Sequence, residues 1–449
     1  MGKLFNKLNK QKEEVTIELD PQQDLAVNTK SNKVLVVAGA GSGKTRVLTE
    51  RVKHLLKEGV TPSNIVAITF TNMASEEMKE RLANVDNIGD VFIGTIHSFA
   101  NKVLKASSKE TYKILNTEIY NSFHKELIEK YCKFLTVTKF LRYQDRLEAY
   151  NLGRISKEEF HRTLKPSEYA ELLFIQGTRK PNSTKAYPKT IKDLCKERNV
   201  ITFDDLLKLA TDYFKNNNSE IEHLLIDEFQ DIGMLEYKFF ESLKAKNVYY
   251  VGDDWQSLYG FKGGSVNIML NLAKDKKFEV ISINNNYRNS KEVLKLATQV
   301  INQVHNKIFK KVNIPSDRET GEVIFGSKYQ FRDIAKRLLK DEENLKDWFV
   351  LVRTNKELME IHDILNSLKI RNTPMRREGL SLVDLNNLMH YNSVKVMTVH
   401  TSKGLEAQNV ILYGNFPVEV PRYRNNQEER KVMYVGITRA KENLILLNK

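Results

Sequence analysis

The sequence of 449 residues is poor in cysteine and in long apolar runs, and each shortage excludes a class of protein. Cys132 and Cys195 are the only cysteines, so neither a disulfide framework nor a cysteine-based zinc cluster can form, and a reducing, cytoplasmic compartment is expected. No apolar stretch reaches the roughly 18 residues that a membrane-spanning helix needs, which argues against a membrane partner. Residues 1–15 are basic but lack a secretory apolar core, so we interpret them as a flexible basic leader.

The length and the charge balance narrow the remaining classes. A chain of this length predicts two to four domains. Lys and Arg number 71 against 57 Asp and Glu, a net charge of +14. Such an excess is typical of proteins that bind a polyanion, because lysine and arginine neutralise phosphates. A solvated lysine-rich surface would give the same count, so the charge alone leaves both interpretations open.

Residues 34–45, VLVVAGAGSGKT, combine an apolar run, a glycine loop and the start of an amphipathic helical pattern. Glycines let backbone N–H groups approach phosphate oxygens, and a helix N-terminus adds partial positive charge. In the pattern GxxxxGK[ST] the lysine reaches the β- and γ-phosphates and the hydroxyl binds Mg²⁺. The first position of the pattern is alanine here. The predicted phosphate-binding residues are Ala38, Gly39, Ala40, Gly41, Ser42, Gly43, Lys44 and Thr45.

A second chemical centre is predicted at residues 224–231, LLIDEFQD. The apolar residues predict a strand that delivers Asp227 to the carboxyl edge of a parallel sheet. We expect Asp227 to share Mg²⁺ with Thr45, and Glu228 to polarise the attacking water, a role that needs a carboxylate beside the γ-phosphate.

Further buried strands are predicted at residues 65–70, 91–93, 248–252 and 280–283. Polar side chains that follow parallel strands gather at one rim of the sheet, where such folds bind ligands. His97 lies at such a strand end, although a core histidine fits the local sequence equally well. Gln256 follows another strand and could bond a γ-phosphate. Beyond it, Tyr259 and Phe261 beside Lys262 either stack on unpaired bases or belong to the core.

Residues 103–199 differ from their surroundings because they are helical in pattern, rich in Lys, Glu and Tyr, and without convincing buried strands. We interpret them as an insertion, with a loop at residues 178–188 and a return helix at 203–214. From residue 286 the α/β pattern restarts without a phosphate loop. Its predicted helices are residues 290–304, 330–339, 356–368 and 428–435, and its predicted strands are residues 322–325, 349–352, 394–398, 410–413 and 444–447.

Nine blocks in this order resemble the UvrD/Rep/PcrA group of superfamily 1 helicases over nearly the whole chain, and the wording GDDWQSLY is similar to the helicase IV branch. The blocks are residues 19–27, AGAGSGKTRVL, AITFTNMASEEM, IGTIHSFA, LLIDEFQD, VGDDWQSLYGFKGG, NNYRNS, VMTVHTSKGLE and YVGITRAK. The resemblance implies an α/β fold with two tandem RecA-like P-loop domains, parallel sheets flanked by helices, and a helical insertion in the first. The implied domains are residues 16–102 with 200–285, the insertion 103–199, and residues 286–449.

The resemblance also implies roles for single residues. On the ATP side, Gln23 would contact adenine, as the donor and acceptor of a glutamine amide allow. Arg46 and Tyr287 would sandwich the adenine ring, Gln256 would sense the γ-phosphate, and Glu406 would touch the ribose. Arg288 and Arg439 would act as arginine fingers from the second domain, although each alone also fits a surface arginine. The implied DNA-binding residues are Phe70, Thr71, Thr95, His97, Tyr259, Phe261, Lys262 and His400.

Two departures from the family pattern affect the expected function. Phe261 stands where relatives often have tryptophan and Lys262 where arginine is frequent, so stacking and the backbone contact should be weaker there. Arg288 and His400 are only 112 positions apart, which leaves a stub near residues 376–391 in place of the large auxiliary domain.

The resemblance implies a 3′→5′ DNA helicase or single-stranded DNA translocase that uses ATP and Mg²⁺ and binds single-stranded and tailed duplex DNA. One alternative is a translocase that strips proteins from DNA and unwinds poorly alone. Another is an ATP-dependent switch that gates a partner nuclease. A replication or repair factor is a further possible partner.

Overall fold

The computed structural model describes residues 18–86, 88–107, 112–151, 160–176, 190–217, 221–258, 266–313, 321–338, 343–375, 382–414, 416 and 427–448. The predicted leader, the predicted loop at 178–188 and three predicted DNA-binding residues, Tyr259, Phe261 and Lys262, lie outside these ranges. Within them, no helix combines the length and the apolar character that crossing a membrane requires.

The first lobe is built on a sheet of six parallel strands in the order β3-β2-β6-β7-β1-β8. Its strands are β1 (Lys33–Ala38), β2 (Ile65–Thr69), β3 (Phe92–Thr95), β6 (His223–Ile226), β7 (Asn247–Gly252) and β8 (Glu279–Ile283). Strand β1 pairs with β7 through Val34 opposite Tyr249, and with the edge strand β8 through Val34 opposite Glu279. Because all pairings are parallel, the carboxyl ends of these strands meet at one edge.

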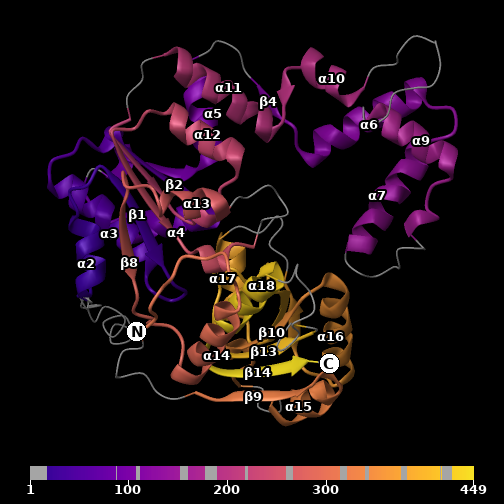
Figure 1. Ribbon diagram of the computed structural model, residues 1–449. Helices are drawn as coiled ribbons and strands as arrows, with labels where there is room; N and C mark the ends of the chain where they lie inside the picture. The colour runs from indigo at the N-terminus through magenta and orange to yellow at the C-terminus, as the bar shows by residue number, and fades with distance from the viewer. Residues whose placement is uncertain are drawn as a thin grey trace, which may run out of the picture.

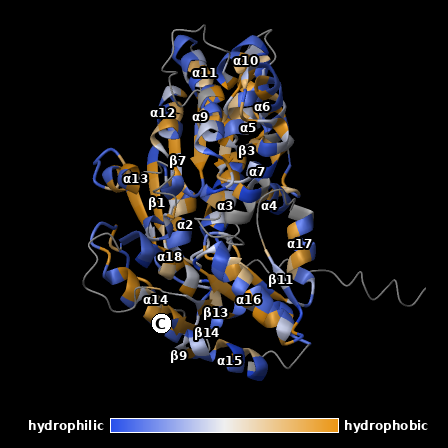
Figure 2. Cartoon of the chain, turned by 90° about the vertical axis from the view of Figure 1, so that its right-hand side faces the viewer, coloured by the Kyte–Doolittle hydropathy of each residue, from blue (hydrophilic) through white to orange (hydrophobic). Residues whose placement is uncertain are grey.

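Side-chain alternation along β1 explains why helices cover both faces of this sheet. Leu35 and Val37 enter one apolar core, whereas Val34 and Val36 enter the core on the opposite face. Buried parallel strands of this kind require helices on each side, and Figure 2 shows the apolar strands β1 and β7 between helices with hydrophilic outer faces. The helices are α2 (Pro21–Asn28), α3 (Lys44–Lys57), α4 (Asn72–Leu82), α5 (Ile96–Ser107), α11 (Phe203–Asn216), α12 (Met234–Ser242) and α13 (Val266–Leu272).

The second lobe repeats the plan with the strand order β11-β12-β10-β13-β14-β9, again entirely parallel. Its strands are β9 (Val323–Ser327), β10 (Trp348–Val352), β11 (Asn372–Pro374), β12 (Val394–Thr398), β13 (Ala407–Tyr413) and β14 (Ala440–Asn448). Its helices are α14 (Lys291–Asn302), α15 (Phe331–Leu338), α16 (Asn355–Ser367), α17 (Leu382–His390) and α18 (Gln427–Ile437). In Figure 1 this lobe lies below the first, in orange and yellow.

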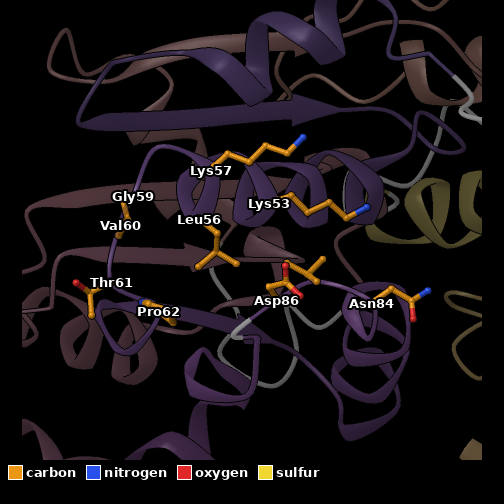
Figure 3. Close-up of a pocket in the computed structure, with 10 residues that line it drawn as sticks. Lys53, Leu56, Lys57, Gly59, Val60, Thr61, Pro62, Asn84 and Asp86 are labelled. Atoms are coloured by element: carbon orange, nitrogen blue, oxygen red, sulfur yellow. The ribbon is translucent and has the colours of Figure 1, made fainter.

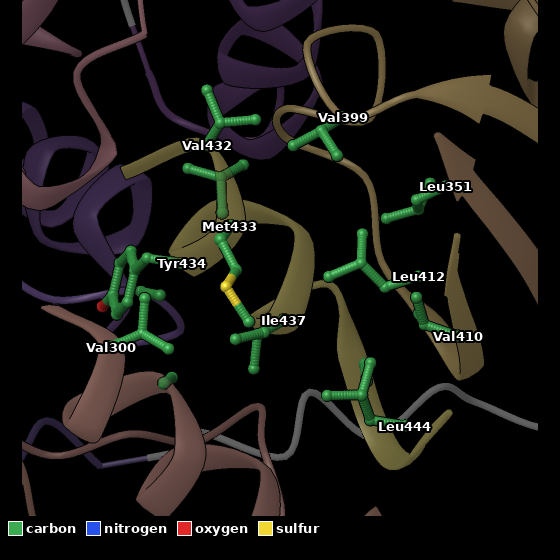
Figure 4. Close-up of a cluster of buried hydrophobic side chains, with 14 of the residues drawn as sticks. Val300, Leu351, Val399, Val410, Leu412, Val432, Met433, Tyr434, Ile437 and Leu444 are labelled. Carbon is green, nitrogen blue, oxygen red and sulfur yellow. The ribbon is translucent and has the colours of Figure 1, made fainter. Parts of the chain in front are cut away.

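The core of the second lobe extends to the first lobe. Figure 4 shows Met433 and Ile437 of α18 facing Leu412 of β13. Ala40 and Trp255, which come from the first lobe, belong to the same buried cluster. The rings of Trp255 and Tyr434 meet edge to face, with centroids 5.6 Å apart. Apolar packing therefore holds the two lobes together beside the glycine loop.

Residues 103–199 contain mainly helices: α6 (Thr117–Tyr131), α7 (Val137–Asn151), α9 (Pro166–Ile175) and α10 (Ile191–Glu197). They have an apolar cluster of their own and project from the first lobe at the upper right of Figure 1. The short strand β4 (Lys113–Ile114) pairs with β5 (Val200–Ile201) where the chain leaves and re-enters the first lobe. The insertion thus folds around a separate core.

Candidate active site

The glycine loop joins β1 to α3 and has backbone angles that explain its glycines. Gly41 has φ +67° and Gly43, the residue before α3, has φ +85°, angles that side chains rarely adopt. The Ser42 hydroxyl donates to the Gly39 carbonyl (2.8 Å) and so closes the loop. Ala38 ends β1 in the buried core opposite Ile283, so at this position the methyl group is accommodated by packing.

The loop places Lys44 and Thr45 on the first turn of α3, opposite the end of β6. The Thr45 hydroxyl lies 3.4 Å from Asp227 Oδ2, and the second carboxylate oxygen of Asp227 accepts from the Glu228 backbone N–H (2.8 Å). Glu228 itself has φ +52°, a left-handed conformation that turns the chain sharply after the strand. Hydroxyl and carboxylate oxygens thus converge beside the phosphate loop.

The pKa values of the adjacent carboxyl groups of Asp227 and Glu228 are shifted in opposite directions. Burial would raise the pKa of Glu228, but the charges of Lys403 and Lys44 outweigh it and lower this pKa to about 2. Burial and repulsion by Glu228 instead raise the pKa of Asp227. Burial also lowers the pKa of Lys44, against the attraction of Glu228. These charges therefore favour the carboxylate form of Glu228, the form that a group orienting water requires.

Gln256 and Arg439 meet at the site from opposite lobes. Gln256 lies in the 3₁₀ turn η4 (Asp254–Gln256), and its amide donates to Asp253 Oδ2 (2.5 Å). Arg439, which follows α18 and is buried, donates from Nη2 to Gln256 Oε1 (3.0 Å) and from Nε to the Val435 carbonyl (3.0 Å). Burial and the charge of Arg288 lower the pKa of Arg439 to about 9.

Arg288 also lies at the glycine loop. A Cβ atom built on Gly41 would meet the Arg288 Cβ at 2.6 Å, and the Tyr287 N–H donates to the Gly41 carbonyl (2.8 Å). The charge of Arg288 reaches Lys44 and contributes to the lowering of its pKa. The two arginines proposed as fingers are therefore both adjacent to the residues around the phosphate loop.

The structure gives Glu406 contacts within the second lobe. It forms ion pairs with Arg288 (2.5 Å) and with Lys441 (2.8 Å). Its negative charge thus balances the charge of Arg288. The contact of Glu406 with the ribose stays a prediction.

The residues expected around adenine lie together beside the loop. Gln23 is buried, donates to the Ser42 carbonyl (2.9 Å) and accepts from the Asp20 N–H (3.2 Å). The Tyr287 hydroxyl donates to Asp20 Oδ2 (2.6 Å), while its ring is 40% exposed. Arg46, on the first turn of α3, is half-buried and acts electrostatically on the Tyr287 hydroxyl. An exposed aromatic ring near an arginine suits a flat base.

Lys403 makes a contact between the lobes that the sequence did not predict. It forms buried ion pairs with Asp231 and, at 3.6 Å, with Glu228, and it donates to the Gln256 carbonyl (3.3 Å). Both Lys403 and Asp231 lie within sequence blocks that resemble the helicase family. The sequence feature that could have indicated this contact is the presence of a charged residue inside each of these blocks.

The four expected DNA-binding residues of the first lobe that the structure describes line a groove of 420 Å³ at the carboxyl ends of β2 and β3. Phe70, Thr71, Thr95 and His97 all line it. The Thr71 hydroxyl also caps α4 by accepting from the Ala74 N–H (3.1 Å). Burial lowers the pKa of His97 and so favours the neutral form of its ring.

Phe203 is a groove residue that the sequence did not predict. Its ring is 51% exposed and meets His97 edge to face at 4.7 Å. An exposed phenylalanine at the start of a helix does not contribute to the core. The position of Phe203 at the N-terminus of α11 is the sequence feature that could have indicated it.

A second groove, of 240 Å³, runs between the lobes and shares Phe70 and Thr71 with the first. Glu228, Asp231 and Lys403 line it, together with Leu385 and Asn386 of α17. His400 is half-buried in the turn after β12, where its carbonyl faces the Lys403 N–H (3.4 Å). The groove therefore connects the predicted DNA side with the carboxylates of the nucleotide site.

A further cavity lies away from these two grooves. It has a volume of 650 Å³ and is lined by the end of α3, including Lys53 and Lys57, and by Asp86 (Figure 3). None of the predicted site residues lines it.

Two parallel, helix-flanked sheets that face each other across a glycine loop define a P-loop protein with two RecA-like domains, as the sequence predicted. Residues 19–277 match the family of the UvrD/REP helicase N-terminal domain, and residues 375–448 match the UvrD-like helicase C-terminal domain. The chain belongs to the UvrD/REP helicase family, which confirms the resemblance noted in its sequence.

Curated relatives give the same family. The ATP-dependent DNA helicase PcrA of Leuconostoc citreum is 30% identical over 384 residues, covering 79% of this chain and 49% of the relative. The ATP-dependent DNA helicase Rep of Buchnera aphidicola is 29% identical, covering 78% and 53%. A probable DNA helicase of Mycoplasma pneumoniae is 27% identical, covering 96% and 83%. The chain thus spans about half the length of the first two relatives.

Proposed function

We propose that this protein hydrolyses ATP between its lobes and uses the cycle to move 3′→5′ along single-stranded DNA, unwinding a duplex ahead of it. The observation that carries the proposal is the meeting of Gln256, from the first lobe, with Arg439, from the second, beside Glu228 and Lys44. Guanidinium groups supplied across a cleft stabilise the charge of a transferring phosphoryl group, an effect of about 10³ to 10⁵ in rate.

The residues present fit a magnesium ion bound with its nucleotide. Asp227 and Thr45 offer oxygen ligands, and Mg²⁺ commonly takes one or two protein ligands plus phosphates and water. In the part of the chain that the structure describes, no group of three or more acidic, histidine or cysteine residues could hold a metal alone. When bound with ATP, Mg²⁺ would neutralise phosphate charge.

The chain's own residues would perform the remaining steps. Lys44 holds the β- and γ-phosphates, and Glu228 orients the attacking water. Arg288 and Arg439 move with the second lobe and stabilise the developing charge. Gln23, Arg46 and Tyr287 hold the base. Glu406 remains paired with Arg288 and contacts the ribose.

The two connected grooves support the DNA part of the proposal. Exposed Phe70 and Phe203 offer faces for base stacking. Phe70 and Thr71 line both grooves, and Lys403 of the second lobe lines the groove between the lobes. A strand lying there would contact both lobes, so opening and closing of the cleft would change its grip. His400, Tyr259, Phe261 and Lys262 are further proposed contacts from matching sequence positions.

The direct test is ATP hydrolysis measured with and without single-stranded DNA. We expect DNA to stimulate turnover, and Lys44→Ala and Glu228→Gln to lose at least about 100-fold because phosphate and water contacts disappear. Lys311→Met, an exposed change, serves as the matched control. Equal turnover with and without DNA would count against a DNA motor.

The second candidate is a translocase that unwinds poorly alone. The short segment near residues 376–391, which stands in place of a large auxiliary domain, favours it. The described part of the segment between β11 and β12 holds one short helix, α17, which packs on the second lobe through Leu385. Strand displacement by dilute protein on 3′- and 5′-tailed forks separates the two. Strong unwinding of the 3′-tailed fork supports the helicase, and protein displacement without unwinding supports the second candidate.

A further inference from the structure

Two segments of the chain lie side by side at the junction of the lobes. Residues 284–289 lead from β8 to α14, and residues 308–313 return beside them after α14. The Asn313 N–H donates to the Asn284 carbonyl (2.8 Å), and the Asn286 N–H donates to the Asn313 carbonyl (2.8 Å). The returning segment is therefore attached to the hinge.

The same returning segment is bonded to η4, the turn that carries Gln256. The Ile308 N–H donates to Asp254 Oδ2 (2.8 Å), and the Trp255 indole N–H donates to the Ile308 carbonyl (3.0 Å). Lys310 forms ion pairs with Asp253 and with Asp254 (2.8 Å), and its Nζ lies 4.5 Å from the centroid of the Trp255 ring.

The burial of this cluster makes it unusual. The Lys310 side chain is 1% exposed, and the side chains of Asp253 and Asp254 are 0% exposed. Removing such charges from water costs several kcal/mol per ion, and buried ion pairs seldom stabilise a fold more than apolar packing would. A lysine buried between two carboxylates and an aromatic face therefore calls for a role beyond stability.

Asp253 links this lysine to the nucleotide site through its two oxygens. Oδ1 accepts from the Lys310 ammonium and from the Trp255 backbone N–H (3.1 Å), whereas Oδ2 accepts from the Gln256 side-chain amide (2.5 Å). The other end of that amide accepts from Arg439 (3.0 Å). Lys310 thus fixes the rotation of a carboxylate whose far oxygen fixes the rotation of Gln256.

We propose that Lys310 is a positioning residue, which holds the Gln256 amide toward Arg439 through Asp253 and so couples the returning hinge segment to the nucleotide site. The inference rests on the proposed ATP hydrolysis. Without Lys310, Asp253 would lose the cation bonded to its Oδ1, its carboxylate would reorient, and Gln256 would lose the partner that aligns it. Misplacement of about 1 Å can cost about 100-fold in rate.

The test compares Lys310→Met with Lys311→Met in the whole chain. Lys311 is the adjacent residue and is exposed, so its change is the matched control. We expect Lys310→Met to lower kcat for DNA-stimulated ATP hydrolysis about 10- to 100-fold, with KM for ATP changed less than about threefold because Lys310 does not touch the nucleotide. Lys311→Met should match the wild type. A folded Lys310→Met protein with wild-type kcat would overturn the proposal.

A spectroscopic readout tests the positioning role separately from turnover. The chain has two tryptophans, so Trp348→Phe leaves Trp255 as the single reporter beside Lys310. In that background, we expect a non-hydrolysable ATP analogue to change the Trp255 emission, and Lys310→Met to abolish the change although the analogue still binds. An unaltered response in Lys310→Met would contradict the proposal. If the wild type binds the analogue and shows the response but hydrolyses no ATP, the proposed function fails instead.

A double variant distinguishes the loss of positioning from the loss of the folded structure. Lys310→Met with Asp254→Asn removes one buried cation and one buried anion, which restores the charge balance. We expect this protein to fold, and its kcat to stay about 10-fold or more below the wild type because Asp253 still lacks its partner. Recovery of wild-type kcat would show that Lys310 only balances charge, and would overturn the positioning role.

Discussion

At the scale of single residues, Gly41 shows how closely the two lobes approach. Its φ is +67°, and a Cβ added to it would lie only 2.6 Å from the Arg288 Cβ, which leaves no room for a side chain. A left-handed backbone costs about 1–2 kcal/mol for other residues. The glycine is thus required both by the loop and by the arginine that faces it.

Gly41→Ala tests this contact. We expect ATP hydrolysis to fall about 10-fold or more, because the added methyl group must displace Arg288 or distort the loop. Gly89→Ala is the matched control, since no atom lies within 4 Å of its Cβ position and its φ lies outside the left-handed region. Wild-type turnover in Gly41→Ala would show that Arg288 need not approach the loop.

Single residues also show what sequence could and could not predict. Lys44, Thr45 and Asp227 were found because each follows a strong strand pattern, and the structure brings them together. Lys310 was not found, because its partners Asp253 and Asp254 lie 57 and 56 positions away in sequence and the local sequence HNKIFKKV gives no sign of burial. Contacts between distant segments depend on packing that periodicity does not reveal.

At the scale of elements, strongly periodic segments were predicted well and polar strand ends were not. The strand predicted at residues 394–398 matches β12. In contrast, β13 begins at Ala407 and β14 at Ala440, earlier than predicted, because polar residues separate these alanines from the apolar run of each strand. Helix α2 begins at Pro21, and the capping box of Asp20 and Gln23 is the sequence signal for this start.

The inserted helices allow a prediction on pH. His124 of α6 is fully buried, stacks on Phe140 with centroids 4.5 Å apart, and bonds the Tyr120 carbonyl (2.9 Å). Burial lowers its pKa below the ordinary 6.5. The unfolded insertion therefore binds a proton more readily, and acid shifts the equilibrium toward it.

We expect the insertion to lose stability as the pH falls below about 6.5, and to keep its full stability above that value. Hydrogen exchange measured by mass spectrometry should show lower protection factors for α6 and α7 at pH 5 than at pH 7. His161→Gln, a change at an exposed histidine, should show the same dependence. Protection factors that do not change between pH 7 and pH 5 would contradict a role of His124 in the stability of the insertion.

At the scale of the whole molecule, the nucleotide site and the groove between the lobes share residues. Glu228 and Lys403 belong to both, because Lys403 pairs with Glu228 (3.6 Å) and both line the groove. A strand that displaces Lys403 would change the field at Glu228. In the proposed function, this arrangement would let DNA alter hydrolysis without any contact with ATP.

In the proposed function, hydrolysis between the lobes would depend most on the two arginines of the second lobe. The decisive measurement is single-turnover ATP hydrolysis with single-stranded DNA for Arg288→Lys and Arg439→Lys, alongside binding of a fluorescent ATP analogue. We predict that hydrolysis slows about 10³-fold or more, with analogue affinity within about 10-fold of the wild type. Hydrolysis at the wild-type rate in both variants would contradict a motor whose catalytic charge comes from the second lobe.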